Sequence, residues 1–557
     1  MSSLCLVGPD VFTDLELFTS FSNDVTQTVM YIFKQYACND GCIPFITNKL
    51  KKPIYNVEDL YGRQHTLKSI LMSYEENTEY VDTILSNIKL YEKDVQWLFN
   101  SKASQEGRSV QTVELDSSDD DKSIVDVMDI VFFKLRFLQC LNKCSSLLFL
   151  KNMYTIVGAP ILGFLSPLLY FIIPYMVLVY KLKFKINIVT FVKVITKSLF
   201  QNHNLRKLLV IQLVTYCVSF FFYCQSLLNT IELAKNTYNV SHHIIQKIKN
   251  VIAYISECDK LKVLFNLSYH SHIDESVPHI DISQKDFLNY GSFLVYYKNI
   301  DTTALKTYLE NINSFLADLT FVKIFSYNDM CFATYNTENQ STFIKTENMY
   351  HLSIQKYVPN NLLLDTNNCI ITGPNAAGKS TFIKGLVLNV LLSQTYGIAN
   401  ASFFELTPFY LINTQINIPD TKGKESLFEA EMFRCKQNID IIKYLPKHYK
   451  GFIVMDEVFS STNVVEGVAG AYGILQKMSS YPNICTVVTT HLLYLTKLPS
   501  FKKYKMNVAF SKNGTITYPY IITLGYSKQL IALELIKNNF DDDVIDTAIS
   551  IKNKLLV

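Results

Sequence analysis

The spacing of hydrophobic positions changes along the chain, and the changes mark regions of different predicted structure. In the first 150 residues, apolar side chains recur at helical spacing over 57–70 and 81–99, which predicts amphipathic helices. Helical spacing returns after residue 232 and includes the stretch 301–319. From about residue 335, short β-rich runs alternate with helical segments, a pattern typical of an α/β domain with a largely parallel sheet.

Two long stretches between these regions, 153–180 and 208–231, contain no charged residue. Each is longer than the roughly 20 apolar residues that a helix needs to cross the hydrocarbon layer. A soluble helix normally turns one polar face to water. We therefore predict two candidate transmembrane segments in a hydrophobic insert at 151–235, with a pair of buried core helices as the alternative.

The segment that connects the two stretches complicates a simple membrane hairpin. Residues 181–207 carry lysine and arginine but no acidic residue, and positive charge near membrane ends prefers the cytoplasmic side. Pro160, Pro167 and Pro174 are placed to break the first stretch into re-entrant half-helices, or to leave it in the membrane interface. The sequence leaves the topology of the insert open.

Composition gives more information about the cellular compartment of the protein than about its activity. A formal net charge of +3 gives no chain-wide positive field for nucleic acid, although it allows a local basic face. The 12 cysteines lack CxxC pairs and histidines at zinc spacing, which favours reduced thiols of an intracellular protein over a metal site or disulfides. The first residues lack the basic and long apolar regions of a signal peptide. The acidic run 116–121 predicts a surface loop, with a phosphorylated or metal-binding patch as the alternative.

A phosphate-binding loop is the clearest chemical motif. The strand-like run 368–372 leads into G-x-x-x-x-G-K-[ST], and the helix-compatible segment 382–392 follows. In this context glycines let the backbone wrap phosphates, and amides at the helix N-terminus face them. We expect Lys379 to reach the β and γ phosphates and the Ser380 hydroxyl to ligate Mg²⁺. The predicted nucleotide-binding loop consists of Gly373, Pro374, Asn375, Ala376, Ala377, Gly378, Lys379, Ser380 and Thr381.

Two further strands are predicted to deliver polar groups to the same sheet edge. The run 451–455 ends in Asp456 and Glu457, and the run 484–490 ends at His491. Ligand sites of open α/β sheets lie at the carboxyl ends of the strands. We expect Asp456 to hold Mg²⁺, Glu457 to polarise the attacking water, and His491 to contact the γ phosphate or that water. A solvated acidic pair and a structural histidine are the alternatives.

These motifs resemble the MutS family. The loop 373–381 is similar to GPNMAGKST, and 456–467 is similar to DEIGRGTSTYDG, although Ser460 and Ser461 replace the usual Arg-Gly. Thr490 and His491 resemble the Thr-His switch of the family. Residues 426–432 resemble STFMVEM, whose serine contacts the nucleotide held by the opposing subunit. The resemblance implies two ATPase domains that face each other, with Ser426 acting in trans.

The resemblance also implies adenine contacts and a helical core. Tyr357 and Tyr520 lie where the family places residues against adenine, with ordinary core tyrosines as the alternative. Weaker similarity to the family's helical core and lever covers about 45–110 and 285–325. The first 150 residues contain no Phe-x-Glu, the motif that family members insert beside a mispaired base. We therefore do not expect this polypeptide alone to read mismatches directly.

Together these features predict a multidomain α and α/β protein. We expect a helical MutS-like core or lever at 1–150 and 236–330, the insert with its segments 153–180 and 208–231, and an ABC-type P-loop ATPase domain at 335–557. The predicted function is a Mg²⁺-dependent ATPase, working as a homodimer on duplex or branched DNA in mismatch repair or recombination. The alternative is a membrane-tethered mechanical ATPase that binds no DNA. In either case we expect an intracellular protein, associated with the membrane through 153–231, whose ATPase domain faces the cytoplasm.

Overall fold

The computed structural model groups the chain into two compact units. It describes residues 3–105, 132–163, 172–266 and 302–555, together with 297 and 300, except for residues 23, 134, 160, 174, 202, 338–340, 366–367, 417–426, 511–515, 530 and 532–540. The first unit comprises 1–85, 263–266 and 310–557, and the second comprises 86–262 and 267–309. The acidic run 116–121 lies outside the described residues.

A seven-stranded sheet forms the centre of the first unit, with the order β1-β9-β10-β11-β6-β12-β15. All neighbouring pairs are parallel except β12 with β15. Its strands are β1 (Leu6–Val7), β6 (Asn368–Thr372), β9 (Leu411–Gln415), β10 (Gly451–Asp456), β11 (Ile484–Thr490), β12 (Lys502–Met506) and β15 (Ile522–Leu524). Every residue of β6, β9 and β11 is buried, as expected for parallel strands covered on both faces.

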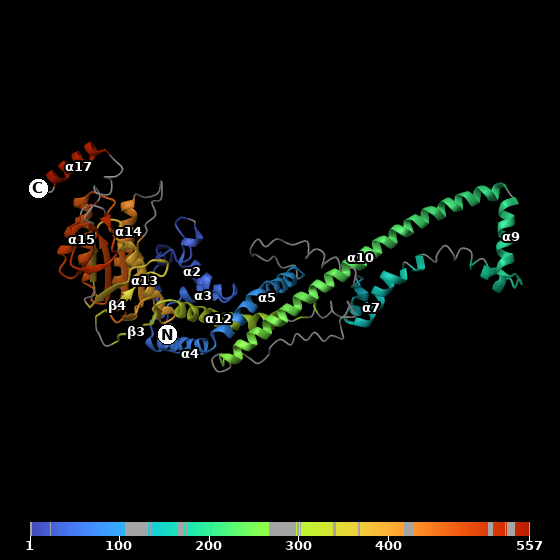
Figure 1. Ribbon diagram of the computed structural model, residues 1–557, viewed down its shortest axis with the longest axis horizontal. Coiled ribbons are helices and arrows are strands. Elements are labelled where there is room, and N and C mark those ends of the chain that lie inside the picture. The colour runs from blue at the N-terminus through green and yellow to red at the C-terminus, as the bar shows by residue number, and fades with distance from the viewer. Residues whose placement is uncertain are drawn as a thin grey trace. The chain divides into compact units, whose positions relative to one another are not determined.

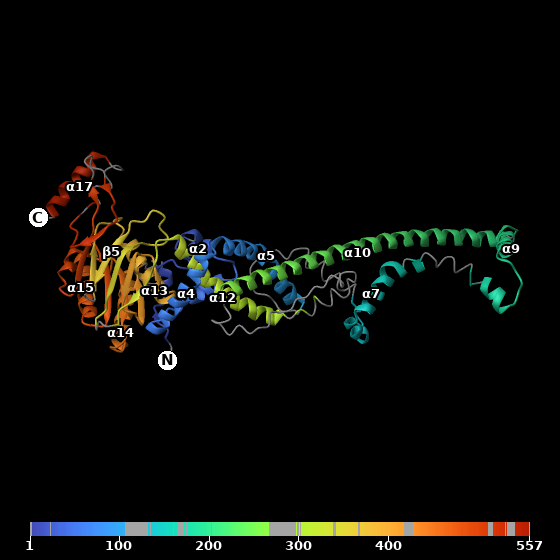
Figure 2. The ribbon, with the colours of Figure 1, turned by 60° about the horizontal axis from the view of Figure 1, so that its bottom comes forward.

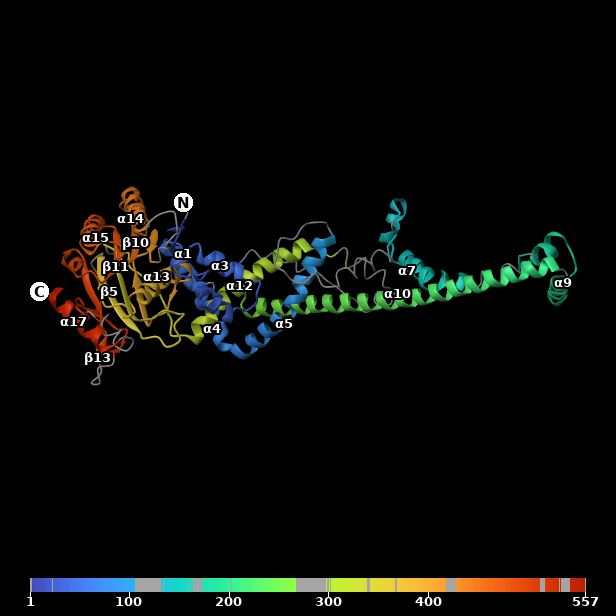
Figure 3. The same ribbon diagram turned by 90° about the horizontal axis from the view of Figure 1, so that it is seen from above.

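Helices cover both faces of this sheet. The helices α14 (Leu427–Tyr444) and α15 (Val464–Ser479) bury Cys435, Leu475 and their neighbours against Ile453 and Met455 of β10. The helix α13 (Lys379–Thr395) lies on the other side, as Figures 2 and 3 show, and nearly all of its residues are buried. A helix buried all round belongs to the interior of a domain, so α13 is part of the core of this unit.

Smaller sheets and helices complete the first unit (Figure 1). A four-stranded sheet has the order β3 (Thr334–Tyr335), β8 (Phe403–Leu406), β4 (Ile344–Met349) and β5 (Asn360–Leu364). Two-stranded sheets pair β2 (Cys331–Phe332) with β7 (Ile398–Ala399) and β13 (Ala509–Phe510) with β14 (Ile516–Thr517). The remaining helices are α1 (Val11–Asp14), η1 (Val25–Gln27), α2 (Val29–Tyr36), α3 (Ile43–Leu50), α4 (Val57–Glu76), η7 (Leu493–Lys497) and α17 (Asp542–Leu555).

The second unit is helical in its described part. Two long helices, α5 (Thr78–Gln105) and α12 (Thr302–Tyr327), belong partly to this unit and partly to the first unit. A third, α10 (His203–Leu264), runs without interruption for 62 residues. Within this unit Trp97 of α5 stacks on Tyr297, and Tyr308 of α12 donates a hydrogen bond of 2.8 Å to Asp259 of α10. Its shorter helices are η2 (Arg136–Lys143), α7 (Ser145–Met153), η3 (Tyr154–Gly158), η4 (Val177–Lys181) and α9 (Ile188–Gln201).

The helical patterns predicted at 57–70, 81–99 and 301–319 correspond to α4, α5 and α12. The structure differs at the N-terminus, where the sequence predicted only a helical region. There β1 adds a parallel strand to the sheet of the C-terminal region, with Leu6 opposite Leu411 and Val7 opposite Ile412. A strand of two residues is too short to show an alternating pattern, so sequence periodicity missed it.

The prediction of membrane-spanning helices is not supported. Among the residues that the structure describes, no helix combines the length and the apolar character that crossing a membrane requires. Part of the stretch 153–180 lies outside those residues, and 208–231 belongs to α10. The prediction rested on missing charge, which is an incomplete criterion, because uncharged polar residues such as Gln225 and Asn229 also disfavour insertion.

Candidate functional site

The predicted phosphate-binding loop connects the buried strand β6 to the first turn of α13. Gly378 caps this helix with φ of +93°, a left-handed conformation that L-residues rarely adopt. A Cβ atom at Gly378 would also lie 2.9 Å from Cδ1 of Tyr520. Backbone conformation and space therefore both call for glycine here, and the loop leads directly into Lys379 at the helix start.

Lys379 is buried under this loop and points across the end of the sheet. Its Nζ donates hydrogen bonds to the carbonyl oxygens of Gly373 at 2.9 Å and Pro374 at 3.2 Å. The same atom lies 3.2 Å from Oε1 of Glu457. Only 4% of the Lys379 side chain is exposed, so its charge is compensated by the partners that surround it.

Asp456 ends β10 beside the serine that follows Lys379. The hydroxyls of Ser380 and Thr489 both donate to its carboxylate, and Thr489 lies opposite Asp456 in the pairing of β10 with β11. Burial raises the pKa of Asp456 above its usual value, and the two hydroxyl hydrogen bonds offset part of that rise. A half-buried carboxylate beside a serine hydroxyl provides two of the oxygen ligands that Mg²⁺ prefers.

Glu457 follows directly and has an unusual backbone. Its φ is +44°, and its N–H donates to the carbonyl oxygen of Thr489 at 3.0 Å. This turn points the Glu457 carboxylate back toward Lys379. On the other side, Nδ1 of His491 lies 3.9 Å from Oε2 of Glu457, which is beyond hydrogen-bond distance.

A cavity of about 780 Å³ opens above these groups. It brings together the predicted residues Tyr357, Asn375, Ala376, Gly378, Lys379, Ser380, Thr381, Asp456, Glu457 and Tyr520. Gly373, Pro374, Ala377 and His491 do not line it, although Gly373 and Pro374 hold Lys379 and His491 lies beside Glu457. Ser426 lies outside the described residues.

The two predicted adenine-contacting tyrosines enter this cavity from different elements. The Tyr357 ring stacks on Tyr350, with ring centroids 3.9 Å apart and planes 13° from parallel, and its hydroxyl donates to Asp329 at 2.9 Å. That hydrogen bond to a carboxylate raises the pKa of Tyr357. The carbonyl oxygen of Tyr520 accepts a hydrogen bond of 2.9 Å from Asn360. Both residues line the cavity, with one face of the Tyr357 ring covered by Tyr350.

Sequence reasoning missed several residues of this wall, including Tyr350, His351, Asn360, Glu431 and Ser460. Glu431 is the most informative, since it is buried and burial raises its pKa. Its interactions with the Ser461 hydroxyl and the backbone N–H of Phe459 offset part of that rise. Its place in the segment 426–432 was the only signal in the sequence. Tyr350 and His351 carry no motif, and only the fold brings them to the site.

Comparisons with known proteins match the part of the chain that holds most of this cavity. The family model "MutS domain V" matches residues 369–556. The chain is 28% identical over 234 residues to the DNA mismatch repair protein MutS of Streptococcus agalactiae, which covers 40% of this chain and 26% of that protein. It is 30% identical over 235 residues to the DNA mismatch repair protein MSH3 of Vanderwaltozyma polyspora, which covers 39% of this chain and 22% of that protein.

A third relative shows the same partial coverage. The DNA mismatch repair protein MutS of Persephonella marina is 30% identical over 205 residues, which is 35% of this chain and 23% of that protein. The chain thus matches about a quarter of the length of these relatives. The matching region holds the loop of Lys379, the strand end of Asp456 and Glu457, and His491. The C-terminal region of the chain is thus similar to domain V of the MutS family.

Proposed function

We propose that this protein is an intracellular ATPase that binds ATP with Mg²⁺ in the cavity above Lys379 and hydrolyses it. The observation that carries the proposal is the convergence of Lys379, Ser380, Asp456 and Glu457 at the carboxyl ends of the parallel strands β6 and β10, which lie on either side of β11. This is the position at which open α/β sheets bind their ligands. Glycine at position 378 fits the close approach of a phosphate to the backbone.

Each group has a role that follows from its surroundings. The amides at the start of α13 and the Lys379 ammonium bind the phosphates, while Ser380 and Asp456 hold Mg²⁺. A Mg²⁺ ion held by these two residues would supply positive charge next to the phosphate oxygens. Glu457 accepts a hydrogen bond from the attacking water and orients it, and His491 lies close enough to stabilise that arrangement. Tyr357 and Tyr520 offer aromatic faces to the base.

The ion pair between Lys379 and Glu457 has to open during this cycle. In the structure the Lys379 ammonium is shared among Glu457 and the two loop carbonyl groups. Phosphate oxygens compete for the same ammonium, so nucleotide binding releases Glu457 from it. The carboxylate is then available to the water, which couples binding of the phosphates to assembly of the hydrolytic group.

We propose further that two copies of the chain face each other across the nucleotide. Four exposed apolar side chains support such an interface: Met432, Phe433, Val464 and Val465. They lie in the second turn of α14 and the first turn of α15, helices that follow β9 and β10 at the same edge of the sheet as the cavity. Exposed apolar groups of this kind mark contact surfaces. Val465→Asp should reduce ATP-dependent dimerisation in sedimentation experiments, whereas unchanged dimerisation would contradict this interface.

The substrate of the cycle is proposed from the relatives, which are DNA mismatch repair proteins. We propose that the ATPase acts with duplex or branched DNA in mismatch repair or recombination. A titration of the full chain on perfect, mismatched and branched duplexes, with and without ATP and at two salt concentrations, tests this. Binding that changes with ATP supports the proposal. No DNA affinity beside intact ATP hydrolysis contradicts it.

ATP hydrolysis itself is tested by changing the acid beside Lys379. Glu457→Gln should reduce steady-state phosphate release by at least about a hundredfold while ATP still binds. Glu76→Gln changes an exposed glutamate at the end of α4, away from the cavity, and serves as the matched control, with turnover close to that of the original chain. Equal turnover of both variants and the original chain would overturn the proposed role of Glu457.

A further inference from the structure

The N-terminal segment 6–16 is built into the nucleotide-binding unit. Its strand β1 pairs with β9, and α1 packs on the same strand. Asp14, the last residue of α1, is completely buried. Burying a carboxylate is costly unless it is paired and hydrogen-bonded, so the partners of Asp14 indicate what this segment stabilises.

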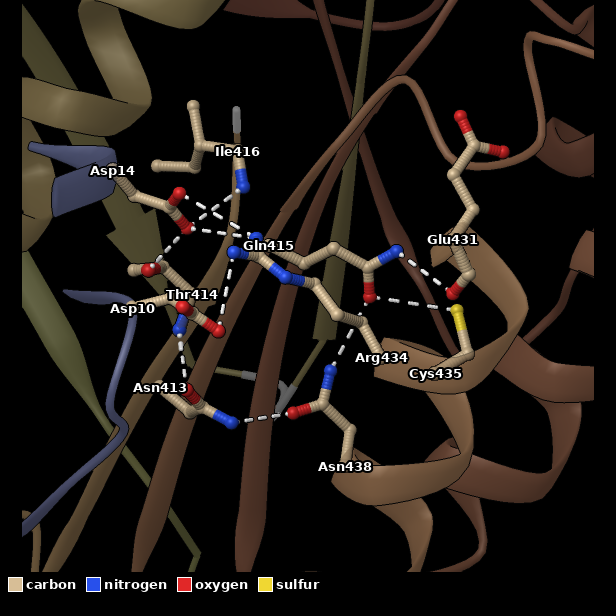
Figure 4. A network of polar contacts seen from close by, with 10 residues as sticks. All are labelled: Asp10, Asp14, Asn413, Thr414, Gln415, Ile416, Glu431, Arg434, Cys435 and Asn438. Atoms are coloured by element: carbon tan, nitrogen blue, oxygen red, sulfur yellow. Dashed lines mark hydrogen bonds and ion pairs between the residues drawn. The ribbon is translucent and has the colours of Figure 1, made fainter. Parts of the chain in front are cut away.

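Those partners come from two elements next to the cavity (Figure 4). Oδ2 of Asp14 accepts hydrogen bonds from the Thr414 hydroxyl at 2.7 Å and from the backbone N–H of Ile416 at 3.0 Å. Nη1 of Arg434 lies 3.5 Å from both carboxylate oxygens, and Nη2 of Arg434 lies 3.1 Å from Oδ2 of Asp10. Asp14 therefore joins the end of β9 to the second turn of α14.

The first turn of α14 supports the loop that follows Glu457. Burial raises the pKa of Glu431, and its interactions with the backbone N–H of Phe459 and the hydroxyl of Ser461 offset part of that rise. The Phe428 ring lies 5.3 Å from the Phe459 ring. Glu457 and Phe459 have φ of +44° and +58°, which are unfavourable values that surrounding contacts must maintain. Moving α14 would therefore disturb the backbone that places the Glu457 carboxylate.

We propose that Asp14 is a positioning residue for ATP hydrolysis, which acts on Glu457 through Arg434, Glu431 and the loop 457–461. Arg434 lies one turn after Glu431 in α14. Contacts that fix the position and rotation of the helix at Arg434 therefore also fix the position of the Glu431 side chain. Hydrogen bonds among four uncharged side chains also join β9 to α14; the residues are Asn413, Gln415, Cys435 and Asn438. The Asp14 carboxylate supplies the buried charge. The inference rests on the proposed ATPase function.

The test is a double-mutant cycle on kcat in the full chain. Asp14→Asn keeps the size of the side chain but places an amide against Arg434. We expect kcat to fall on the order of 10- to 100-fold, because small displacements of a catalytic group have effects of this size. The KM for ATP should change by less than about threefold, since Lys379 and its loop do not contact Asp14. Glu431→Gln should also lower kcat, and the double variant should be no slower than the slower single variant.

Two further variants exclude a general loss of stability. Asp318→Asn breaks the ion pair between Asp318 and Lys49 elsewhere in the same unit and should leave kcat unchanged. Arg434→Gln breaks the Asp14 pair from its less buried side and should reproduce the kcat loss, even if Asp14→Asn does not fold. Asp14→Glu, which retains the charge, should recover part of the activity.

The results separate the inference from the proposed function. If Asp14→Asn and Arg434→Gln fold and hydrolyse ATP at the original rate, or if the losses of Asp14→Asn and Glu431→Gln multiply, Asp14 does not act through Glu431. If the original chain does not hydrolyse ATP and Glu457→Gln changes nothing, the proposed function itself fails. In that case intact ATP binding by both Asp14→Asn and the original chain would still show that the nucleotide cavity does not depend on Asp14.

Discussion

Nζ of Lys379 lies 3.2 Å from Oε1 of Glu457, so the proposed phosphate-binding group and the proposed hydrolytic group already contact each other across the end of the sheet. They come from elements that the sequence separates widely, the start of α13 and the end of β10. The parallel order β10-β11-β6 brings these ends together. In the proposed site, the Glu457 carboxylate and the phosphates of a bound nucleotide therefore compete for the Lys379 ammonium group.

The first prediction concerns this competition. Glu457→Gln should bind ATP about fivefold more tightly than the original chain, because a neutral amide releases Lys379 to the phosphates and an ion pair that is partly open to solvent is worth about 1 kcal/mol. Calorimetric titration with ATP measures the change. Lys379→Met is the counterpart, and its ATP affinity should fall at least tenfold. Weaker binding to Glu457→Gln than to the original chain would show that the pair does not compete with nucleotide.

The second prediction concerns the glycine that caps α13. Gly378→Ala should weaken ATP binding by roughly tenfold, because alanine disfavours φ of +93° and its Cβ would lie 2.9 Å from the Tyr520 ring. Gly473→Ala is the matched control, since a Cβ there meets nothing within 4 Å and the position is helical. That control should raise the free energy of unfolding by about 0.5–1 kcal/mol with ATP affinity unchanged. Equal ATP affinities of the two variants would contradict the tight fit at Gly378.

The third prediction concerns His351, which lies in the cavity wall. Burial, together with the nearby Lys384 charge, lowers its pKa from 6.5 to about 4. The unfolded chain therefore binds a proton below pH 6.5 that the folded chain takes up only near pH 4. Stability from His351 is present above pH 6.5 and is lost as the pH falls toward 4. Urea unfolding at several pH values measures this loss.

A variant without the imidazole isolates this effect. His351→Gln should show a shallower decline of the urea midpoint between pH 6.5 and 4 than the original chain. His448→Gln removes an exposed histidine and should keep the original slope. Identical pH profiles for all three chains would mean that His351 is not buried as a neutral group.

The fourth prediction concerns the free-energy cost of burying Asp456, the proposed Mg²⁺ ligand. Burial raises the pKa of Asp456, so its ionised form opposes folding once the pH exceeds the ordinary aspartate value of 3.8. Asp456→Asn removes this cost and should raise the Tm at neutral pH by about 1–3 °C. The same variant should lose the Mg²⁺ dependence of ATP binding. Scanning calorimetry with and without Mg²⁺ gives both readouts, and a lower Tm for Asp456→Asn would contradict the burial cost.

The chemistry of the site was largely readable from the sequence. Lys379 and Ser380 belong to one continuous strand–loop–helix motif, and Asp456 and Glu457 end one buried strand. Motifs of this kind are local, because the periodicity and the special residues needed to recognise them lie within a few positions. The sequence also predicted that these strand ends meet, since parallel strands place their carboxyl ends at one edge.

The tertiary structure alone decided which distant groups support that chemistry. The pairing of β1 with β9, the burial of Asp14 beside Arg434 and the stacking of Tyr350 on Tyr357 leave no local signal. Each depends on contacts between residues that are far apart in the chain or outside any motif. The uncharged stretches 153–180 and 208–231 are the contrasting case, because local composition alone predicted membrane crossing there and the described helices do not support it. Local patterns therefore determined the chemistry, while packing between distant segments determined what holds the catalytic groups in place.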